Sequence, residues 1–180
     1  MAAVVGVHGM AWGSGMHPSP STGPEKREGD GKSPAGIFSI CPAYGYDSAP
    51  PSKTLWPYRQ STSDLCCVDD SKSRHYNRIV SKSKSKDWTS AEEMVRPDGL
   101  YRRVIGVGHN LPAAPSKGSC IFLHVWKNGH TGTSGCTAIS LKNIEFILAW
   151  LDPAARPVLV QLPKSVHRDV EAAWGLPAIR

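Results

Sequence analysis

Two residues of this chain have the types and the spacing of a nucleophile and its base. His124 lies inside an apolar segment, 121–126 (IFLHVW), and Cys136 follows it twelve residues later. A cysteine attacks carbonyl groups as its thiolate, and a neighbouring imidazole can accept the proton and hold the pair charged. The pair therefore predicts acyl transfer through a cysteine.

The residues between them contain a tight-turn signal. Asn128-Gly129 stands between the apolar segment and a run rich in Thr and Gly, which predicts that the chain folds back and brings Cys136 near the end of the strand that carries His124. Gly135 leaves the backbone beside the sulfur uncrowded, so nearby N–H groups can face a developing oxyanion. The alternative is a buried structural cysteine and a core histidine joined by an ordinary hairpin.

Composition indicates one β-rich domain. A chain of 180 residues is long enough for a substantial core, and we expect a single domain over residues 1–180. The 17 Gly and 15 Pro, with little helical periodicity before residue 140, favour strands and ordered loops over a helical bundle.

Positive charge exceeds negative charge, and the net value is +6. This favours anionic surroundings without choosing among them. Part of the excess lies in 72–74 (KSR) and in 81–86 (SKSKSK), which we interpret as a solvated loop. No aromatic residues are interleaved with this run, so nucleic acid is not an expected partner.

The chain has no stretch of the roughly 20 apolar residues that a membrane span needs and no signal-peptide pattern at its amino terminus. We expect that an export signal has been removed or lost. The five cysteines fit either two disulfides plus one free nucleophile or five reduced thiols. Adjacent Cys66 and Cys67 are not expected to pair with each other, so any bridges would run from them to Cys41 and Cys120.

Several elements follow from local patterns. Strands are expected over 3–7, 37–40, 101–107, 121–126 and 158–160, with an irregular segment over 42–57.

Three helices are expected. Ser90 and Glu93 form a capping box that predicts a short helix ending before Pro97. Ser140 caps a longer helix whose apolar residues, from Leu141 to Leu151, share one face. A terminal helix ends at Gly175.

The segment 124–136, with its Ser-Gly-Cys ending, resembles the signature of the L,D-transpeptidase catalytic domain, a family of bacterial cell-wall cysteine acyltransferases. Residues 26–38 (KREGDGKSPAGIF) resemble a glycine- and proline-containing motif of that family. Residues 68–70 (VDD), 76–78 (YNR) and 106–110 (GVGHN) resemble its branch of compact single-domain members.

The matches run in order over roughly residues 26–162. The resemblance implies a mainly β fold, a β-sandwich of mixed sheets with small peripheral helices, and a cleft with the cysteine at its base. It also implies attack on a peptidoglycan stem tetrapeptide, release of the terminal D-amino acid, and transfer of the acyl group from a thioester to an amine. No metal or organic cofactor is needed. We expect a monomer that is periplasmic, cell-wall associated or secreted.

Carried over by position, Cys136 is the nucleophile and His124 its base and later its acid, with Ser134 and Gly135 completing the catalytic set. The N–H groups of Gly135 and Cys136 are the implied oxyanion donors. Many members have an arginine or asparagine two residues after the cysteine, where this chain has Ala138 preceded by Thr137. That substrate contact must come from elsewhere, or the substrate differs.

Candidates for substrate binding lie elsewhere on the chain. They are Asn77, Arg78, His109, Asn110, Trp126 and Thr137. For Asn77 and Arg78 the alternative is a structural turn and a salt bridge, and for Trp126 it is packing. His109 and His130 are alternative partners of the thiol or of its histidine, and His130 is expected in a loop that gates the cleft.

Other functions remain open. Water in place of the amine would make the same thioester enzyme an L,D-carboxypeptidase. The fold could also serve as a noncatalytic wall-binding module. A third alternative is amide formation or hydrolysis on a different peptide that contains a D-residue.

Overall fold

The computed structural model describes residues 1–18, 22–50, 53–83 and 85–179. Within these residues, eight strands form one large mixed sheet and three form a small antiparallel sheet. The strands of the large sheet are β1 (Ala3–Val4), β2 (Met10–Trp12), β3 (Ser33–Gly45), β4 (Tyr58–Gln60), β8 (Arg103–Val107), β9 (Phe122–Val125), β10 (Thr137–Ile139) and β11 (Val158–Gln161). Those of the small sheet are β5 (Leu65–Val68), β6 (Arg78–Ser81) and β7 (Ala91–Glu93).

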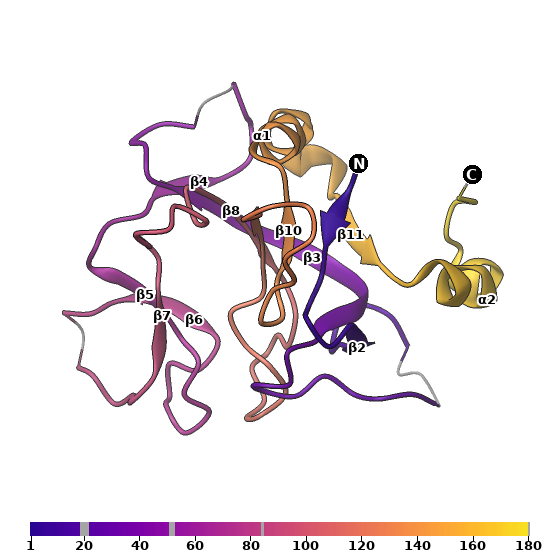
Figure 1. The fold of residues 1–180 in the computed structure, drawn as a ribbon, viewed down its shortest axis with the longest axis horizontal. Helices are drawn as coiled ribbons and strands as arrows, with labels where there is room; N and C mark the ends of the chain where they lie inside the picture. Colours follow the sequence, from indigo (N-terminus) through magenta and orange to yellow (C-terminus); the bar gives the residue numbers. More distant parts are fainter. Residues whose placement is uncertain (19–21, 51–52, 84, 180) are drawn as a thin grey trace.

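The large sheet follows the order β1-β10-β9-β8-β3-β11, and β2 and β4 also pair with the long strand β3. Four of its pairings are antiparallel. Three are parallel: β10 with β9, and β2 and β4 with β3. The small sheet has β5 at its centre, between β6 and β7. Figure 1 shows the small sheet at the left of the molecule.

Two α-helices lie at the periphery of the described chain, α1 (Leu141–Trp150) and α2 (Lys164–Trp174), with a 3-10 turn at Pro153–Ala155. Helix α1 lies above the large sheet, and α2 is at the far right, away from the small sheet (Figure 1). The expected mainly β fold of mixed sheets with small peripheral helices is confirmed.

Alternation along β9 assigns its residues to two cores. Leu123 and Val125 pack with Ile144 and Leu148 of α1 on one face of the large sheet. Phe122 belongs to the second core, toward the small sheet. Since side chains two residues apart on a strand share a face, His124 lies on the same side as Phe122.

Both longer helices are confirmed, and their caps explain where they begin and end. The Ser140 hydroxyl accepts a hydrogen bond from the Asn143 N–H at the start of α1. Gly175, with φ of 62°, ends α2 in the left-handed conformation that glycine adopts without strain. The strands expected near 101–107, 121–126 and 158–160 are also present, with shorter or shifted ends.

The short helix expected after Ser90 is wrong. Residues 91–93 form strand β7, in which Glu92 is paired with Cys67 of β5. Met94, the next residue, is fully buried. Pairing to a buried strand therefore overrides the capping pattern, which would stabilise only one helical turn.

Other local expectations fail where the chain makes long-range pairs. The expected strand at 37–40 extends over 33–45, so residues 42–45 are not irregular; residues 51–52 of the expected irregular segment lie outside the described residues. The expected first strand, 3–7, covers only Ala3–Val4. Of the charged run 81–86, Ser81 ends β6 and residue 84 is outside the described part.

The turn signal at Asn128-Gly129 does not produce a hairpin. Strands β9 and β10 are parallel, with His124 opposite Ala138, so the intervening loop carries the chain back to the start of β9. Cys136 therefore lies level with Phe122, at the beginning of the strand that carries His124 and not at its end. Parallel pairing still leaves both residues on neighbouring strands.

Candidate active site

A cleft of about 460 Å³ opens beside the start of β9 and β10, lined by residues of both sheets. This volume lies within the range of ligand-binding pockets. Its lining includes the four expected catalytic residues, Cys136, His124, Ser134 and Gly135. The structure therefore brings the whole predicted catalytic set to one cleft.

Cys136 lines this cleft, and the residue is only 7% exposed. Sγ accepts a hydrogen bond from the Phe122 N–H at 3.3 Å and donates one to the Cys120 carbonyl at 3.4 Å. Cys120, just before β9, thus accepts a hydrogen bond from the sulfur, and Phe122, the first residue of β9, donates one to it.

Burial raises the pKa of Cys136 to about 12, with the carboxylate of Glu92 acting in the same direction. The Phe122 N–H and Tyr101 oppose this effect and favour the thiolate. Burial therefore favours the neutral thiol of Cys136, whereas the sequence predicts a charged pair with His124.

His124 has one ring nitrogen fixed and the other free. Its Nδ1 lies 2.8 Å from the Val125 carbonyl, which can only accept, so Nδ1 carries the proton and Nε2 is an acceptor. Burial lowers the pKa of His124, which keeps the ring neutral. Among the described residues, no hydrogen bond joins Nε2 to Cys136, whose S–H donates to the Cys120 carbonyl.

Tyr101 fixes the position of the His124 ring. The two ring centroids are 5.2 Å apart in an edge-to-face arrangement. The Tyr101 hydroxyl donates to Glu92 of β7 at 2.5 Å. Burial raises the pKa of Glu92, so this carboxyl group titrates above its ordinary range.

Hydrogen bonds fix the loop before the nucleophile. Ser33 and Thr133 both donate their hydroxyl groups to the Cys136 carbonyl, at 2.7 and 2.5 Å. The Gly135 N–H donates to the Thr133 hydroxyl at 3.1 Å, so one of the two implied oxyanion donors is already occupied. Gly135 has φ of 155°, a backbone conformation that residues with side chains rarely adopt, and a Cβ there would lie 3.3 Å from the Lys32 carbonyl, so the position favours glycine.

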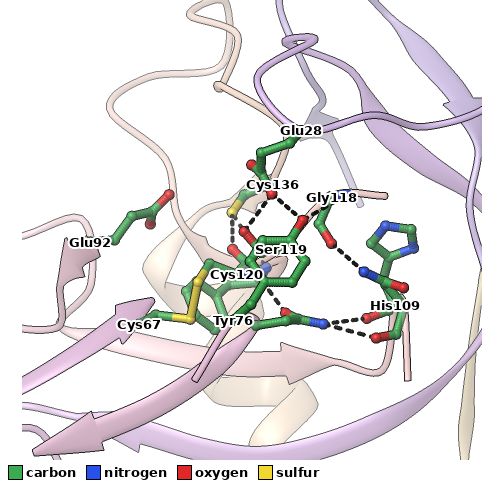
Figure 2. Close-up of a disulfide and its surroundings, with 12 residues drawn as sticks. Glu28, Cys67, Tyr76, Glu92, His109, Gly118, Ser119, Cys120 and Cys136 are labelled. Carbon is green, nitrogen blue, oxygen red and sulfur yellow. Dashed lines mark hydrogen bonds between the residues drawn. A yellow bond between two sulfur atoms is a disulfide. The ribbon is translucent and has the colours of Figure 1, made fainter. Parts of the chain in front are cut away.

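The segment that contacts the sulfur is joined to the small sheet by a disulfide. Cys67 of β5 is bonded to Cys120, and the bridge lies next to Cys136 in Figure 2. This is one of the bridges expected from the sequence. The second is absent from the described chain, since Cys41 and Cys66 are free.

A side-chain network supports the same segment (Figure 2). The hydroxyl groups of Tyr76 and Ser119 both donate to the carboxylate of Glu28, at 2.5 and 2.7 Å. The Tyr76 hydroxyl in turn accepts from the Gly118 N–H at 3.1 Å. These bonds hold residues 118–120 against the wall of the cleft.

Three expected substrate-binding residues have structural partners instead. Asn77 donates to the carbonyls of His109 and Asn110 and accepts from the Cys120 N–H. The Asn110 amide bonds to Ala114 and Gly118 within its own loop. The His109 Nε2 lies 2.9 Å from the Lys117 carbonyl. None of the three lines the cleft that holds Cys136.

The other expected contacts also lie outside the cleft lining. Arg78 and His109 line a separate pocket of about 310 Å³ beside Cys41 and the disulfide. The Thr137 hydroxyl donates to Gln161 at 2.5 Å. Trp126 and the exposed His130 are in the loop after β9, and neither is part of the lining. A substrate role for these residues stays a prediction.

The cleft contains residues that the sequence reasoning missed. They are Lys26, Glu28, Asp69, Glu92, Arg96, Leu100, Tyr101, Ser119 and Lys127. Lys26, Glu28 and Asp69 belong to motifs noted in the sequence, but no local pattern connects the others to Cys136. Among the described residues, no group of three or more His, Cys, Asp or Glu side chains is placed to hold a metal ion.

Comparison with known proteins shows the family to which the chain belongs. The model of the YkuD L,D-transpeptidase catalytic domain matches residues 9–160 of the 180. The chain belongs to this family. Comparisons with curated proteins and with solved structures found no match.

Membership of the L,D-transpeptidase family fits the cleft. The family consists of enzymes that act on peptidoglycan of the cell wall, and the described residues include no helix long and apolar enough to cross a membrane. The match includes both His124 and Cys136. The match therefore supports L,D-transpeptidase-family activity in general for this site.

Proposed function

We propose that this protein is a cysteine acyltransferase that forms a thioester with a peptidoglycan stem peptide and passes the acyl group to an amine. One observation supports it most: Cys136 and His124 line the same cleft, and Nε2 of His124 can accept a proton because Nδ1 carries one. A sulfur and a base on neighbouring strands are the minimum for this chemistry.

The first half of the reaction begins from a neutral thiol and a neutral imidazole. The S–H turns from the Cys120 carbonyl toward Nε2 of His124, which takes the proton as Sγ bonds to the substrate carbonyl carbon. The carbonyl oxygen becomes negative. As the C–N bond to the terminal D-amino acid breaks, His124 returns the proton to the departing amine, and a thioester with Cys136 remains.

The second half reverses these roles. An acceptor amine attacks the thioester carbonyl, and His124 takes a proton from its nitrogen. The C–S bond breaks, the proton returns to sulfur, and a new amide leaves the cleft. Water in place of the amine would give a free carboxylate, so the acceptor alone separates transpeptidase from L,D-carboxypeptidase.

We also propose that the protein works outside the cytoplasm, at the cell wall, as a monomer. The disulfide between Cys67 and Cys120 fits an oxidising compartment. The net charge of +6 fits an anionic polymer as its surroundings.

Intact-mass analysis of the purified protein with a stem tetrapeptide tests the proposal. We expect an adduct equal to the tetrapeptide minus its terminal D-amino acid, and a cross-linked dimeric peptide when an acceptor amine is present. Cys136→Ala should abolish both, whereas Cys41→Ala, which removes another free cysteine, should abolish neither.

Each other outcome points to a different function. A shortened peptide without any dimer would identify a carboxypeptidase. Failure of the unmodified protein to form an adduct with stem peptides or with a carbapenem would contradict the enzymatic proposal and favour a noncatalytic wall-binding module.

A further inference from the structure

A buried lysine reaches the cleft beside the nucleophile. Lys26 is only 3% exposed, yet it lines the same cleft as Cys136. Its Nζ donates to the Arg27 carbonyl at 2.7 Å and to Asp30 Oδ1 at 2.6 Å. A lysine ammonium has three N–H donors, so these two bonds leave one donor without a partner among the described residues.

Two glycines make room for this side chain. A Cβ at Gly118 would lie 3.1 Å from Cγ and 3.3 Å from Cε of Lys26. A Cβ at Gly135 would lie 3.7 Å from its Nζ. The aliphatic part of Lys26 therefore passes over Gly118, and the ammonium ends beside Gly135, the residue that precedes the nucleophile.

The ammonium is fixed in place. Asp30 accepts from Lys26 and also from the backbone N–H groups of Arg27 and Lys32, at 2.8 and 2.9 Å. Because these backbone bonds hold the carboxylate, Lys26 has a rigid partner. Its positive charge also lowers the pKa of Cys136, which is consistent with proximity to the sulfur.

The oxyanion formed during acylation needs donors that the backbone does not fully supply. The Gly135 N–H is occupied by the Thr133 hydroxyl. The Cys136 N–H has no partner among the described backbone bonds, so it is the one implied backbone donor still free. A second donor close to Gly135 would complete a site for the negative oxygen.

We propose that Lys26 is a catalytic residue that donates its third N–H to the oxyanion formed when Cys136 attacks the substrate carbonyl. This inference rests on the proposed acyltransferase function. Lys26 then acts with the Cys136 N–H, and its charge stabilises the tetrahedral intermediates that precede and follow the thioester. No bond to Lys26 forms or breaks in either step.

Two reactions of the same sulfur test this role. A carbapenem acylates a thiol through an oxyanion, whereas iodoacetamide alkylates it by displacement of iodide without one. We compare Lys26→Met with Lys117→Met, a matched change at an exposed lysine paired with Glu25. Rates of modification at Cys136 are followed by intact mass and assigned by peptide mass.

For Lys26→Met we expect acylation to slow on the order of 10²-fold, the usual effect of removing one oxyanion donor. Alkylation at a pH that ionises the thiol should slow less than about tenfold, because it depends only on the thiolate. Lys26→Arg, which keeps the charge, should retain more acylation than Lys26→Met. Lys117→Met should leave both rates unchanged.

If Lys26→Met slows acylation and alkylation to the same extent, or does not slow acylation, the proposal is overturned. If Lys26→Met does not fold by circular dichroism, Lys26→Gln and Lys26→Arg take its place, and equal acylation by these two would equally overturn a role for the charge. Since the unmodified protein is acylated in each of these cases, they leave the acyltransferase function intact. Absence of acylation in the unmodified protein would instead contradict both.

Discussion

The Cys136 thiol donates its proton to a backbone carbonyl, while the imidazole of His124 is held neutral two residues along the neighbouring strand. Both groups have shifted pKa values that favour the uncharged form. We therefore expect ionisation of the sulfur to accompany substrate binding, and we expect Cys136 to react slowly with small electrophiles at neutral pH.

The rate at which iodoacetamide alkylates Cys136 should keep rising steeply with pH above the ordinary pKa range of a thiol. Because the folded protein holds the pKa near 12 instead of 9.0, the thiolate fraction at pH 9 is small and increases until about pH 12. Rates measured by intact mass between pH 7 and 11 check this. A plateau below pH 9 would contradict the neutral resting thiol.

His124→Gln should slow acylation by a carbapenem by about 10²- to 10⁴-fold, the range for loss of a general base. In the unmodified protein the lowered pKa of His124 keeps the ring neutral as pH falls through 6.5, so the acidic limb of the pH–rate profile should lie below that pH. His75→Gln, a histidine change outside the cleft lining, is the control. An acidic limb unaffected by the His124 change would argue against its role as base.

The segment 118–122 positions the sulfur, and long-range bonds to Cys67 and Asn77 hold it. Both of these residues belong to or adjoin the small sheet, whereas Cys136 adjoins the large one. The geometry of the nucleophile therefore depends on how the two sheets are joined.

Replacing Cys67 and Cys120 together with alanine should destabilise the fold by about 4 kcal/mol. The bridge closes a loop with a sequence separation of 53 residues, and the value follows from the loss of loop-closure entropy in the unfolded chain. Urea denaturation measures the change, and acylation should slow because the Cys120 carbonyl and the Phe122 N–H are less firmly held. Cys41→Ala is the control; equal stability of the two variants would refute the prediction.

Asn77→Ala should lower the free energy of unfolding by about 2–4 kcal/mol, because three hydrogen bonds to buried backbone groups are lost. Arg78→Ala, at the exposed neighbour, should change stability by less than about 0.5 kcal/mol. Thermal unfolding followed by circular dichroism compares the two variants. A normal melting temperature for Asn77→Ala with a raised KM for stem peptide would instead support a substrate role.

Elements with complete local signals were predictable from the sequence. Helix α1 has both a capping serine, Ser140, and an apolar face whose Ile144 and Leu148 are fully buried. The helix expected after Ser90 had a capping box but only one turn before Pro97, and pairing with β5 decided its structure. Short strands such as β5 and β6 have too few residues to show alternation.

The residues of the candidate site also differ in how far the sequence could predict them. Cys136 and His124 are close in sequence, so their types and spacing were enough to predict a pair. Lys26, Tyr101 and Glu92 reach the cleft from three separate segments, and only the tertiary fold brings them to the sulfur. The turn at Asn128-Gly129 predicted a reversal but could not predict that β9 and β10 pair in parallel.

The two cores lie on opposite faces of the large sheet and share its strands β8 and β9. Disruption of either face therefore disturbs the other, and we propose that residues 1–180 form one domain. We expect a single unfolding transition, with coincident curves from tryptophan fluorescence and far-ultraviolet circular dichroism.

Leu148→Ala tests this coupling from the face opposite the cleft. The side chain is fully buried, and its truncation should lower the free energy of unfolding by about 2–5 kcal/mol. The single transition should shift as a whole. Appearance of a second, unshifted transition would show that the sheets unfold independently.

The bridge between Cys67 and Cys120 has a further consequence for the chemical lifetime of the enzyme. Cys120 packs in the same core cluster as Cys136, so a reduced Cys120 would place a second thiol near it. Oxidants could then join these two sulfurs. Because the Cys120 sulfur is bonded to Cys67, we expect the bridge to protect Cys136 from this mode of oxidation.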